Sequence, residues 1–405
     1  MANLYLKLPN KIYVLCICML INGLGNFVLP LITFIFKLKI GYSEQQIGLI
    51  ITLFIICQAP CLIIGGKLID HYGRKPLMIL SYGLAAICYL MCSLIEPSTL
   101  MAVLIILASV FFSISMPVLN TLITDFTNKD NRKGSFSLMY LANNIGFSIA
   151  PLLGGLMFAS YLNVLFIINA VSMIISLILF CIFIQEPVSR TYEEKENQEG
   201  IADVFSSKKS TLAVLARHPI LIVTAAVMFI YQFSYSQWGF LLPLQMVDQF
   251  SDGGTRLYGI VAGVNGVAVI LLTPFLTYRL RNIGSIKLIV SGGVCYAAAF
   301  LVFGFADAIS IFVAGIIIMT LGEVMIVMNY NIFLANNVPE SHRGRILSLL
   351  PIITGAGYAL GPVVVGKYTY MGYTVLWILL GMSVFLAAVT LRIIPFSKKQ
   401  RKYQL

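Results

Sequence analysis

Charged residues are scarce in this sequence. Asp, Glu, Lys and Arg make up 11% of its 405 residues, whereas a typical soluble protein has about 25%. Hydrophobic residues make up 59%, and the mean hydropathy is +0.92. This composition excludes an ordinary soluble protein and predicts an integral membrane protein.

Several kinds of chemistry lack the residues that they need. The chain has three histidines and no Gly-x-x-x-x-Gly-Lys-Ser/Thr phosphate loop, so direct use of ATP within this chain has no support. Its eight cysteines lie inside the apolar segments, far from the histidines, which favours packing residues over disulfides or a zinc site. We expect no enzyme activity, no metal and no cofactor.

Apolar segments recur along the chain at the length of about 20 residues that a membrane-spanning helix needs. The alternating pattern of a membrane β-barrel is absent, and the first segment is too long for the core of a cleaved signal peptide. We predict an all-α membrane protein with twelve transmembrane helices, near residues 12–36, 47–69, 76–95, 99–124, 136–159, 163–185, 219–247, 257–278, 286–306, 309–335, 346–366 and 374–395.

The placement of positive charge tests this topology. With both termini cytoplasmic, every lysine and arginine lies on the cytoplasmic side except Lys37, Lys39, Arg256 and Lys367. The positive-inside rule requires such a bias, so we predict a multi-pass protein of the cell membrane with both termini in the cytoplasm. The net charge of +11 then reflects orientation in the membrane, and we expect no nucleic-acid partner.

One long polar segment, residues 186–217, divides the chain into an N-terminal half (1–185) and a C-terminal half (218–405), each with six predicted helices. A solvated cytoplasmic linker is the favoured interpretation, and a contact of its basic residues with anionic lipid is the alternative. The halves match at a constant offset of 211 residues, in the pairs Asn120 and Asn331, Arg132 and Arg343, Gly146 and Gly357, Pro151 and Pro362, and Gly155 and Gly366.

Glu323 is the one acid of sixteen that lies deep inside an apolar segment, within one helical turn of the middle of residues 309–335. A charged carboxylate at that depth costs at least about 2.5 kcal/mol, and apolar surroundings favour its neutral form. We predict that Glu323 binds and releases a proton. The alternative is a protonated side chain that only joins helices by hydrogen bonds.

Two motifs carry a resemblance to a known family. Residues 66–75 read Gly-x-Leu-x-Asp-x-x-Gly-Arg-Lys in the link between the second and third segments, and residues 146–155 read Gly-x-x-x-Ala-Pro-x-x-Gly-Gly in the fifth. With Leu321-Gly322-Glu323 and the segment 339–344, they resemble the major facilitator superfamily, in particular its twelve-span drug/proton antiporters. The resemblance implies the major facilitator fold, with substrate bound near the membrane midplane between two parallel repeats.

The resemblance also implies roles for the motif residues. In the first motif, Asp70, Gly73, Arg74 and Lys75 would control a cytoplasmic gate, and Asp125 at the end of span four could pair with Arg74. In the second motif, close helix packing is expected, with prevention of a leak as an equally open role, from Gly146, Ala150, Pro151, Gly154 and Gly155. Many relatives carry a buried arginine in span four, but residues 103–124 contain no cation, so proton coupling could rest on Glu323 alone.

In the facilitator fold, spans one, four, seven and ten line the central cavity. The polar and aromatic residues there suit a hydrophobic or amphipathic molecule, a cation included, although each could instead serve helix packing. The candidates are Asn22, Asn26, Ser113, Asn120, Tyr231, Gln232, Tyr235, Gln237, Trp238, Asn329 and Tyr330.

We therefore predict a secondary active transporter that exports small hydrophobic or amphipathic compounds in exchange for protons by alternating access. Its expected partners are the lipid bilayer, a small-molecule substrate and protons, and we expect it to function as a monomer. Two alternatives stay open: a facilitator-fold importer or exporter of sugars or metabolites, and a non-transporting receptor or sensor.

Overall fold

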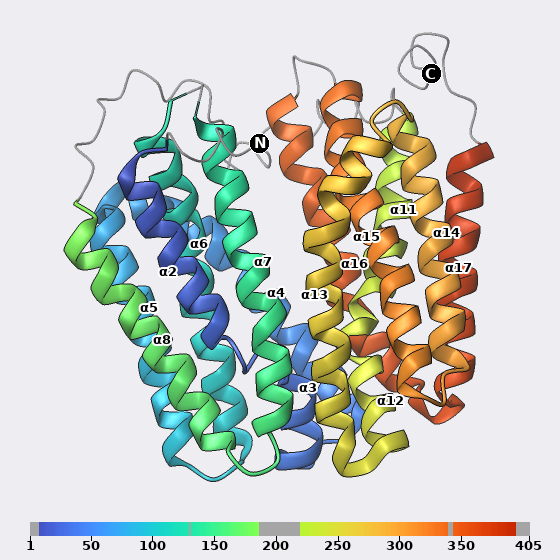
Figure 1. The fold of residues 1–405 in the computed structure, drawn as a ribbon, viewed down its shortest axis with the longest axis horizontal. Coiled ribbons are helices and arrows are strands. Elements are labelled where there is room, and N and C mark those ends of the chain that lie inside the picture. Colours follow the sequence, from blue (N-terminus) through green and yellow to red (C-terminus); the bar gives the residue numbers. More distant parts are fainter. Residues whose placement is uncertain (1–7, 129–130, 186–218, 339–342, 394–405) are drawn as a thin grey trace. The chain divides into compact units, whose positions relative to one another are not determined.

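All secondary structure that the structure describes is helical (Figure 1). The structure is a computed structural model that describes residues 8–128, 131–185, 219–338 and 343–393. Within these ranges, eleven helical segments are long and apolar enough to cross a membrane. Ten are single helices: α4 (Glu44–Tyr72), α5 (Arg74–Leu94), α6 (Thr99–Phe126), α7 (Arg132–Met157), α8 (Leu162–Phe183), α13 (Gly254–Arg279), α14 (Ser285–Gly304), α15 (Ile309–Asn337), α16 (Arg343–Lys367) and α17 (Tyr373–Ile393).

The first and seventh predicted spans are interrupted. The first consists of α2 (Asn10–Gly25), α3 (Ile32–Phe34) and a π-helical turn, η1 (Ile35–Ile40). The seventh predicted span consists of α11 (Pro219–Tyr235), a 3-10 turn η3 (Ser236–Trp238) and α12 (Leu241–Phe250). Together these three elements form the one apolar segment of the eleven that is not a single helix. The two interruptions correspond, because Asn26 and Gln237 stand at the 211-residue offset and each lies in its break. Interrupted spans at matching positions of two repeats mark the binding site in many transporters.

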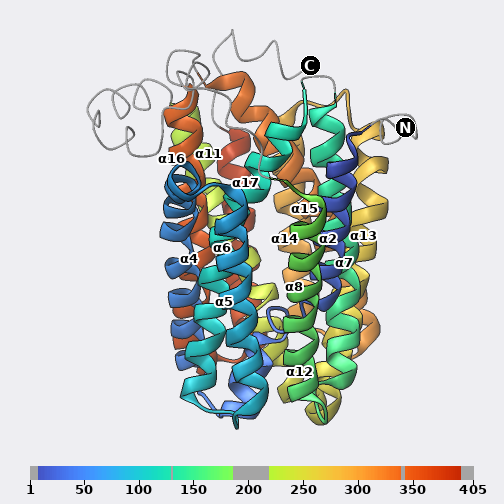
Figure 2. The same cartoon turned by 90° about the vertical axis from the view of Figure 1, so that its left-hand side faces the viewer.

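The chain forms two compact units. Unit 1 consists of Met1–Ser43, Leu53–Ser189 and Pro243–Ile270, and unit 2 consists of Glu44–Thr52, Arg190–Leu242 and Leu271–Leu405. Inside unit 1, α2 packs against α7 and α8, and α5 packs against α6 and α8 (Figure 2). Inside unit 2, α11 packs against α16 and α17, and α14 packs against α15 and α17. The same four pairings thus recur, as the sequence repeat predicts. The division into halves at 186–217 stays a prediction, because that linker lies outside the described residues.

Each unit contains a short segment from the other half of the sequence, held by glycines. In unit 1, a Cβ on Gly155 of α7 would lie 2.5 Å from Thr255 O, and one on Gly259 of α13 would lie 2.5 Å from Pro151 O. We call this contact the α7–α13 seam. Backbones approach this closely only where small residues stand.

Unit 2 repeats the same contact between α4 and α16. A Cβ on Gly366 would lie 2.8 Å from Glu44 O, and a Cβ on Gly48 would collide with Pro362 O. Thr52 Oγ1 also donates a hydrogen bond to Ala359 O at 2.7 Å. We call this contact the α4–α16 seam. All four of its glycine-contact positions correspond to those of the α7–α13 seam at the 211-residue offset, so the repeat extends to the packing of individual glycines.

Candidate functional site

Glu323 lies at the midpoint of α15, near tyrosines from three other helices. Tyr235 of α11, Tyr296 of α14 and Tyr358 of α16 all lie within electrostatic reach of its carboxylate, and a side-chain hydrogen bond joins Tyr235 to it. We call these three residues the tyrosine cluster. The ring centroids of Tyr235 and Tyr296 are 5.7 Å apart in a stacked arrangement, and those of Tyr235 and Tyr358 are 6.4 Å apart. An acid beside aromatic faces can hold a proton or attract an organic cation.

Glycines set the position of this acid. A Cβ on Gly322 would lie 2.6 Å from Gly292 O, and a Cβ on Gly292 would lie 2.8 Å from Gly322 O. The backbones of α14 and α15 therefore touch next to Glu323. Gly293 leaves room for the hydroxyl group of Tyr231, which a Cβ at that position would displace. Side chains at these glycines would move α15, and with it Glu323, away from the tyrosine cluster.

Several buried polar atoms near the end of α11 have no hydrogen-bond partner. Among the described residues, the buried side-chain atoms without a hydrogen-bond partner are Tyr231 Oη, Ser234 Oγ, Gln237 Oε1 and Tyr330 Oη. Buried polar atoms in proteins are nearly always paired with protein or ordered water. Ser234 lies within one turn of the break and Gln237 lies in it, while Tyr231 is between one and two turns before it. Tyr231 adjoins the tyrosine cluster, because its ring centroid is 6.2 Å from that of Tyr296. This arrangement can bind a molecule that supplies the missing partners.

The matching break in unit 1 is different, because its polar groups are paired. Asn22 Nδ2 donates a hydrogen bond to Tyr82 Oη at 2.8 Å, and the backbone N–H of Val28 donates to Asn169 Oδ1 at 3.5 Å. Ser113 is buried and donates to Val110 O at 2.8 Å. Asn22 thus joins α2 to α5, and Ser113 bonds within its own helix; contact of either residue with substrate stays a prediction.

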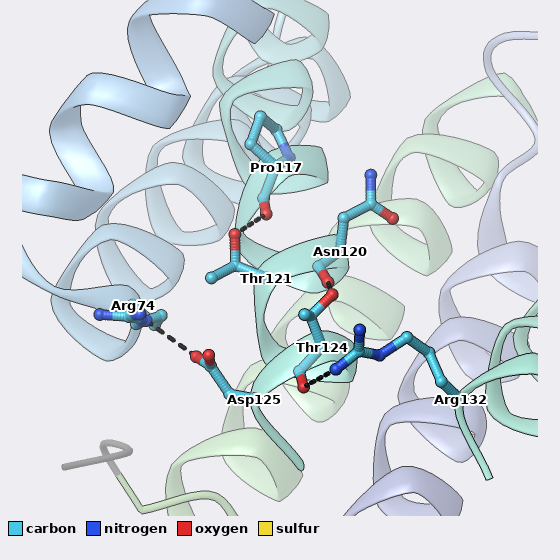
Figure 3. Close-up of polar contacts among 7 residues, drawn as sticks. All are labelled: Arg74, Pro117, Asn120, Thr121, Thr124, Asp125 and Arg132. Carbon is cyan, nitrogen blue, oxygen red and sulfur yellow. Dashed lines mark hydrogen bonds and ion pairs between the residues drawn. The ribbon is translucent and has the colours of Figure 1, made fainter. Parts of the chain in front are cut away.

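The other predicted substrate residues vary in exposure. Asn120 is exposed, and its amide points away from the ion pair near the end of α6 (Figure 3). Asn26 and Gln232 are half-buried, and Trp238 is buried in the α11 break. Asn329 donates a hydrogen bond to Met325 O at 2.8 Å. Their contact with substrate stays a prediction.

Two of the predicted gate residues form an ion pair. Arg74 Nε lies 3.1 Å from Asp125 Oδ2 (Figure 3), and both side chains are partly buried. A cation in the first turn of α5 and an acid in the last turn of α6 each oppose the dipole of their own helix. The ion pair offsets both unfavourable positions. The side chain of Asp70 lies outside what the structure describes, so its role stays a prediction.

Further cations gather at the ends of α6 and α8. Arg132 Nη2 donates to Thr124 O at 3.2 Å (Figure 3), the Lys11 ammonium lies 4.6 Å from the centre of the Phe126 ring, and Lys75 Nζ donates to Cys181 O at 2.7 Å. Basic side chains at helix C-termini pair with the last carbonyl groups. The first motif thus joins the ends of α5, α6 and α8 within unit 1.

Gly73 has a backbone that only glycine adopts readily, with φ +85° and ψ 172°. We expect Gly73→Ala to lower the free energy of unfolding by about 1–3 kcal/mol, because a side chain is strained there. Thermal unfolding measures the loss. The matched control is Gly83→Ala, inside α5, the helix that Gly73 precedes, where a Cβ meets open space. An equal effect of both substitutions would remove the special role of Gly73.

The span-five motif is a packing element on two sides. Gly146 meets Gly23 of α2, where an added Cβ would lie 2.6 Å from the Gly23 Cα, and Gly154 adjoins Phe27. Pro151 and Gly155 form the α7–α13 seam, and Ala150 is fully buried. The motif residues therefore lie in close helix contacts, and their packing role and a role against leakage both stay predictions.

Sequence reasoning missed four residues around these sites. Tyr296 and Tyr358 lie outside the four spans expected to line the cavity, and their positions at the repeat offset hold Ala85 and Phe147, which give no signal. Tyr82 and Ser234 were likewise indistinguishable from ordinary helix residues. For the described residues, the structure shows no group of three metal-ligating side chains.

The long apolar helices and the interrupted spans define a multi-pass membrane protein. The family model of the Major Facilitator Superfamily matches residues 15–362 and 256–404. The chain belongs to this superfamily and is a membrane transporter.

Individual relatives extend the comparison. The chain is 20% identical over 375 residues to a Na(+), Li(+), K(+)/H(+) antiporter of Planococcus maritimus, covering 87% of this chain and 88% of that protein. It is 23% identical over 365 residues to the class C tetracycline resistance protein of Escherichia coli, covering 89% and 90%. The crystal structure of the nucleoside transporter NupG superposes with a TM-score of 0.76 at 15% identity, covering 95% of this chain and 98% of that one. At that identity the likeness shows the fold alone.

Proposed function

We propose that this transporter exports small hydrophobic or amphipathic compounds, cations among them, in exchange for protons. The observation that carries the proposal is the deep carboxylate of Glu323 beside the tyrosine cluster. The unpaired buried atoms of the α11 break support a binding site on the same helix as Tyr235. Antiport and drug resistance in the named relatives support the coupling and the substrate class.

The proposed exchange follows from the cost of charge in a membrane. A charged Glu323 is stabilised by the Tyr235 hydroxyl group and by a cation on the ring faces. A protonated Glu323 is neutral and attracts the cation less, so proton and substrate compete for the same group. Binding one releases the other, as antiport requires.

In the proposed mechanism, alternating access would involve the two glycine seams and the Arg74–Asp125 ion pair. Each glycine seam joins a helix of one sequence half to a helix of the other, so a rocking motion of the repeats must separate both seams. The Arg74–Asp125 pair and the helix ends that it joins would form the cytoplasmic gate. Arg74 and Lys75 hold that end of unit 1 together through side-chain hydrogen bonds.

The proposal is tested with purified protein in proteoliposomes under an imposed pH gradient. The probe is ethidium, an aromatic cation. We expect ethidium to accumulate in the compartment with the higher proton concentration, to a ratio of about ten per pH unit for one-for-one exchange, because one pH unit is equivalent to about 1.4 kcal/mol. Dissipating the gradient with an ionophore should abolish accumulation.

The same vesicles separate the alternatives. Exchange of labelled for unlabelled ethidium without response to the gradient would contradict proton coupling, and binding without exchange would indicate a receptor. No ethidium exchange or binding, with exchange of a sugar or other metabolite, would contradict the substrate class. Accumulation of a metabolite from the extracellular side would indicate an importer.

A further inference from the structure

A cavity of about 230 Å³ lies between the end of α13, the start of α14 and the second half of α15. Its wall is mostly apolar and includes Leu276, Leu288 and Val324. Met325 and Met328 add flexible side chains that adapt to a ligand of irregular shape. The cavity can therefore take a flexible hydrocarbon chain.

The mouth of the cavity is positively charged. Arg281 and Ser285 line it, and none of the described residues that line the cavity is acidic. The sequence has no Asp or Glu from residue 254 to residue 306, while Arg279 and Lys287 flank Arg281. The guanidinium of Arg281 lies 5.0 Å from the centre of the Tyr278 ring, which holds it beside the mouth.

The first turn of α14 adds hydrogen-bond donors at the same place. Ser285 is its first residue, and the N-cap residue, Gly284, makes no side-chain cap. Backbone N–H groups at a helix N-terminus attract phosphate oxygens. A phosphate at Arg281 would thus gain a second set of donors.

The surroundings of the mouth are suited to lipid. On α13, Leu271, Phe275 and Tyr278 are all more than 60% exposed, and in a membrane such side chains contact acyl chains. Ile283 and Ile332, which line the cavity, are 42% and 48% exposed. In a membrane, the exposed parts of these two side chains would contact acyl chains beside the cavity.

We propose that this cavity binds an anionic phospholipid, with its phosphate at Arg281 and the N-terminus of α14 and one acyl chain between α13, α14 and α15. Val324, next to Glu323 in sequence, lies in the wall that the acyl chain would contact. The lipid would therefore touch the helix that carries the proposed proton site.

Native mass spectrometry tests the site on purified protein incubated with equal amounts of phosphatidylglycerol and phosphatidylcholine. We expect wild type to retain phosphatidylglycerol preferentially, and Arg281→Gln to retain it about fivefold less, because one cation near the membrane surface contributes about that factor. Arg279→Gln is the matched control, since Arg279 does not line the cavity. Met328→Phe fills the cavity and should lower retention while leaving Arg281 in place.

Each result decides the proposal. Equal retention by wild type and Arg281→Gln would overturn it, as would an equal loss in Arg279→Gln, which would indicate general surface charge. Full retention in Met328→Phe would show that the acyl chain lies elsewhere. Displacement of the lipid by millimolar inorganic phosphate would indicate a site for free anions, and displacement by ethidium would indicate a substrate site.

Discussion

Glu323→Gln is expected to reduce the gradient-driven accumulation of ethidium from a ratio of about ten to about one. Glutamine keeps the shape of the side chain and can accept a hydrogen bond from Tyr235, but it cannot release a proton. Exchange of labelled for unlabelled ethidium should continue at equal pH, because that exchange needs no net proton movement. The measurement compares both activities in the same proteoliposome preparation.

A matched control for this substitution is Thr320→Val. Thr320 is buried on α15 within one turn of Glu323, and its hydroxyl donates a hydrogen bond to Ile316 O at 2.7 Å. The Thr320→Val variant removes a polar group at a depth similar to that of Glu323. It should still accumulate ethidium under the pH gradient. Full accumulation by Glu323→Gln would rule out Glu323 as the coupling group. Loss of accumulation in both variants would show that the effect of Glu323→Gln comes from general damage to α15.

Gly259→Val is expected to slow ethidium exchange by about one to two orders of magnitude. Even a Cβ at this position lies 2.5 Å from Pro151 O, a backbone atom that cannot rotate away. The side chain therefore holds α7 and α13 apart and prevents the α7–α13 seam from closing. Forced overpacking of this kind costs about 1–3 kcal/mol, enough to depopulate the closed state by one to two orders of magnitude.

Two further variants help to explain the effect of Gly259→Val. Gly263→Ala lies one turn along α13, where a Cβ would make an ordinary contact of 3.4 Å, and it should retain exchange. Gly48→Val, the counterpart in the α4–α16 seam, should fail in the same way as Gly259→Val. Size-exclusion chromatography must show that the variants are folded. Normal exchange by folded Gly259→Val would show that the seam does not take part in transport.

Sequence alone predicted the membrane helices and Glu323, because lipid imposes strong constraints on both. A helix must supply about 20 apolar residues to cross the membrane, and a deep carboxylate is rare enough to stand out. The Arg74–Asp125 pair was also accessible, since both residues lie at the ends of neighbouring predicted helices. Each of these features depends only on where a residue lies along its own helix relative to the membrane, which the sequence gives directly.

Features that depend on the rotation of one helix against another were not accessible. Tyr296 and Tyr358 meet Glu323 only because of how α14, α15 and α16 pack, and the contact of Gly292 with Gly322 sets part of that packing. The break after Tyr235 was hidden because residues 236–240 contain no proline and continue an apolar segment. Gly48 and Gly259 match at the repeat offset, but nothing in either segment alone marks them as contacts.

The exchanged segments also have a consequence for how the protein is made. Unit 1 includes residues 243–270, which are synthesised well after the rest of that unit. Until these residues are synthesised, the face of α7 with Pro151 and Gly155 has no α13 to pack against. The contact of Gly48 of α4 with α16 forms later still, because α16 is synthesised after α13. Partly folded chains with uncovered surfaces associate wrongly. We therefore expect the first half of the chain, produced alone, to be unstable in the membrane until the second half is supplied.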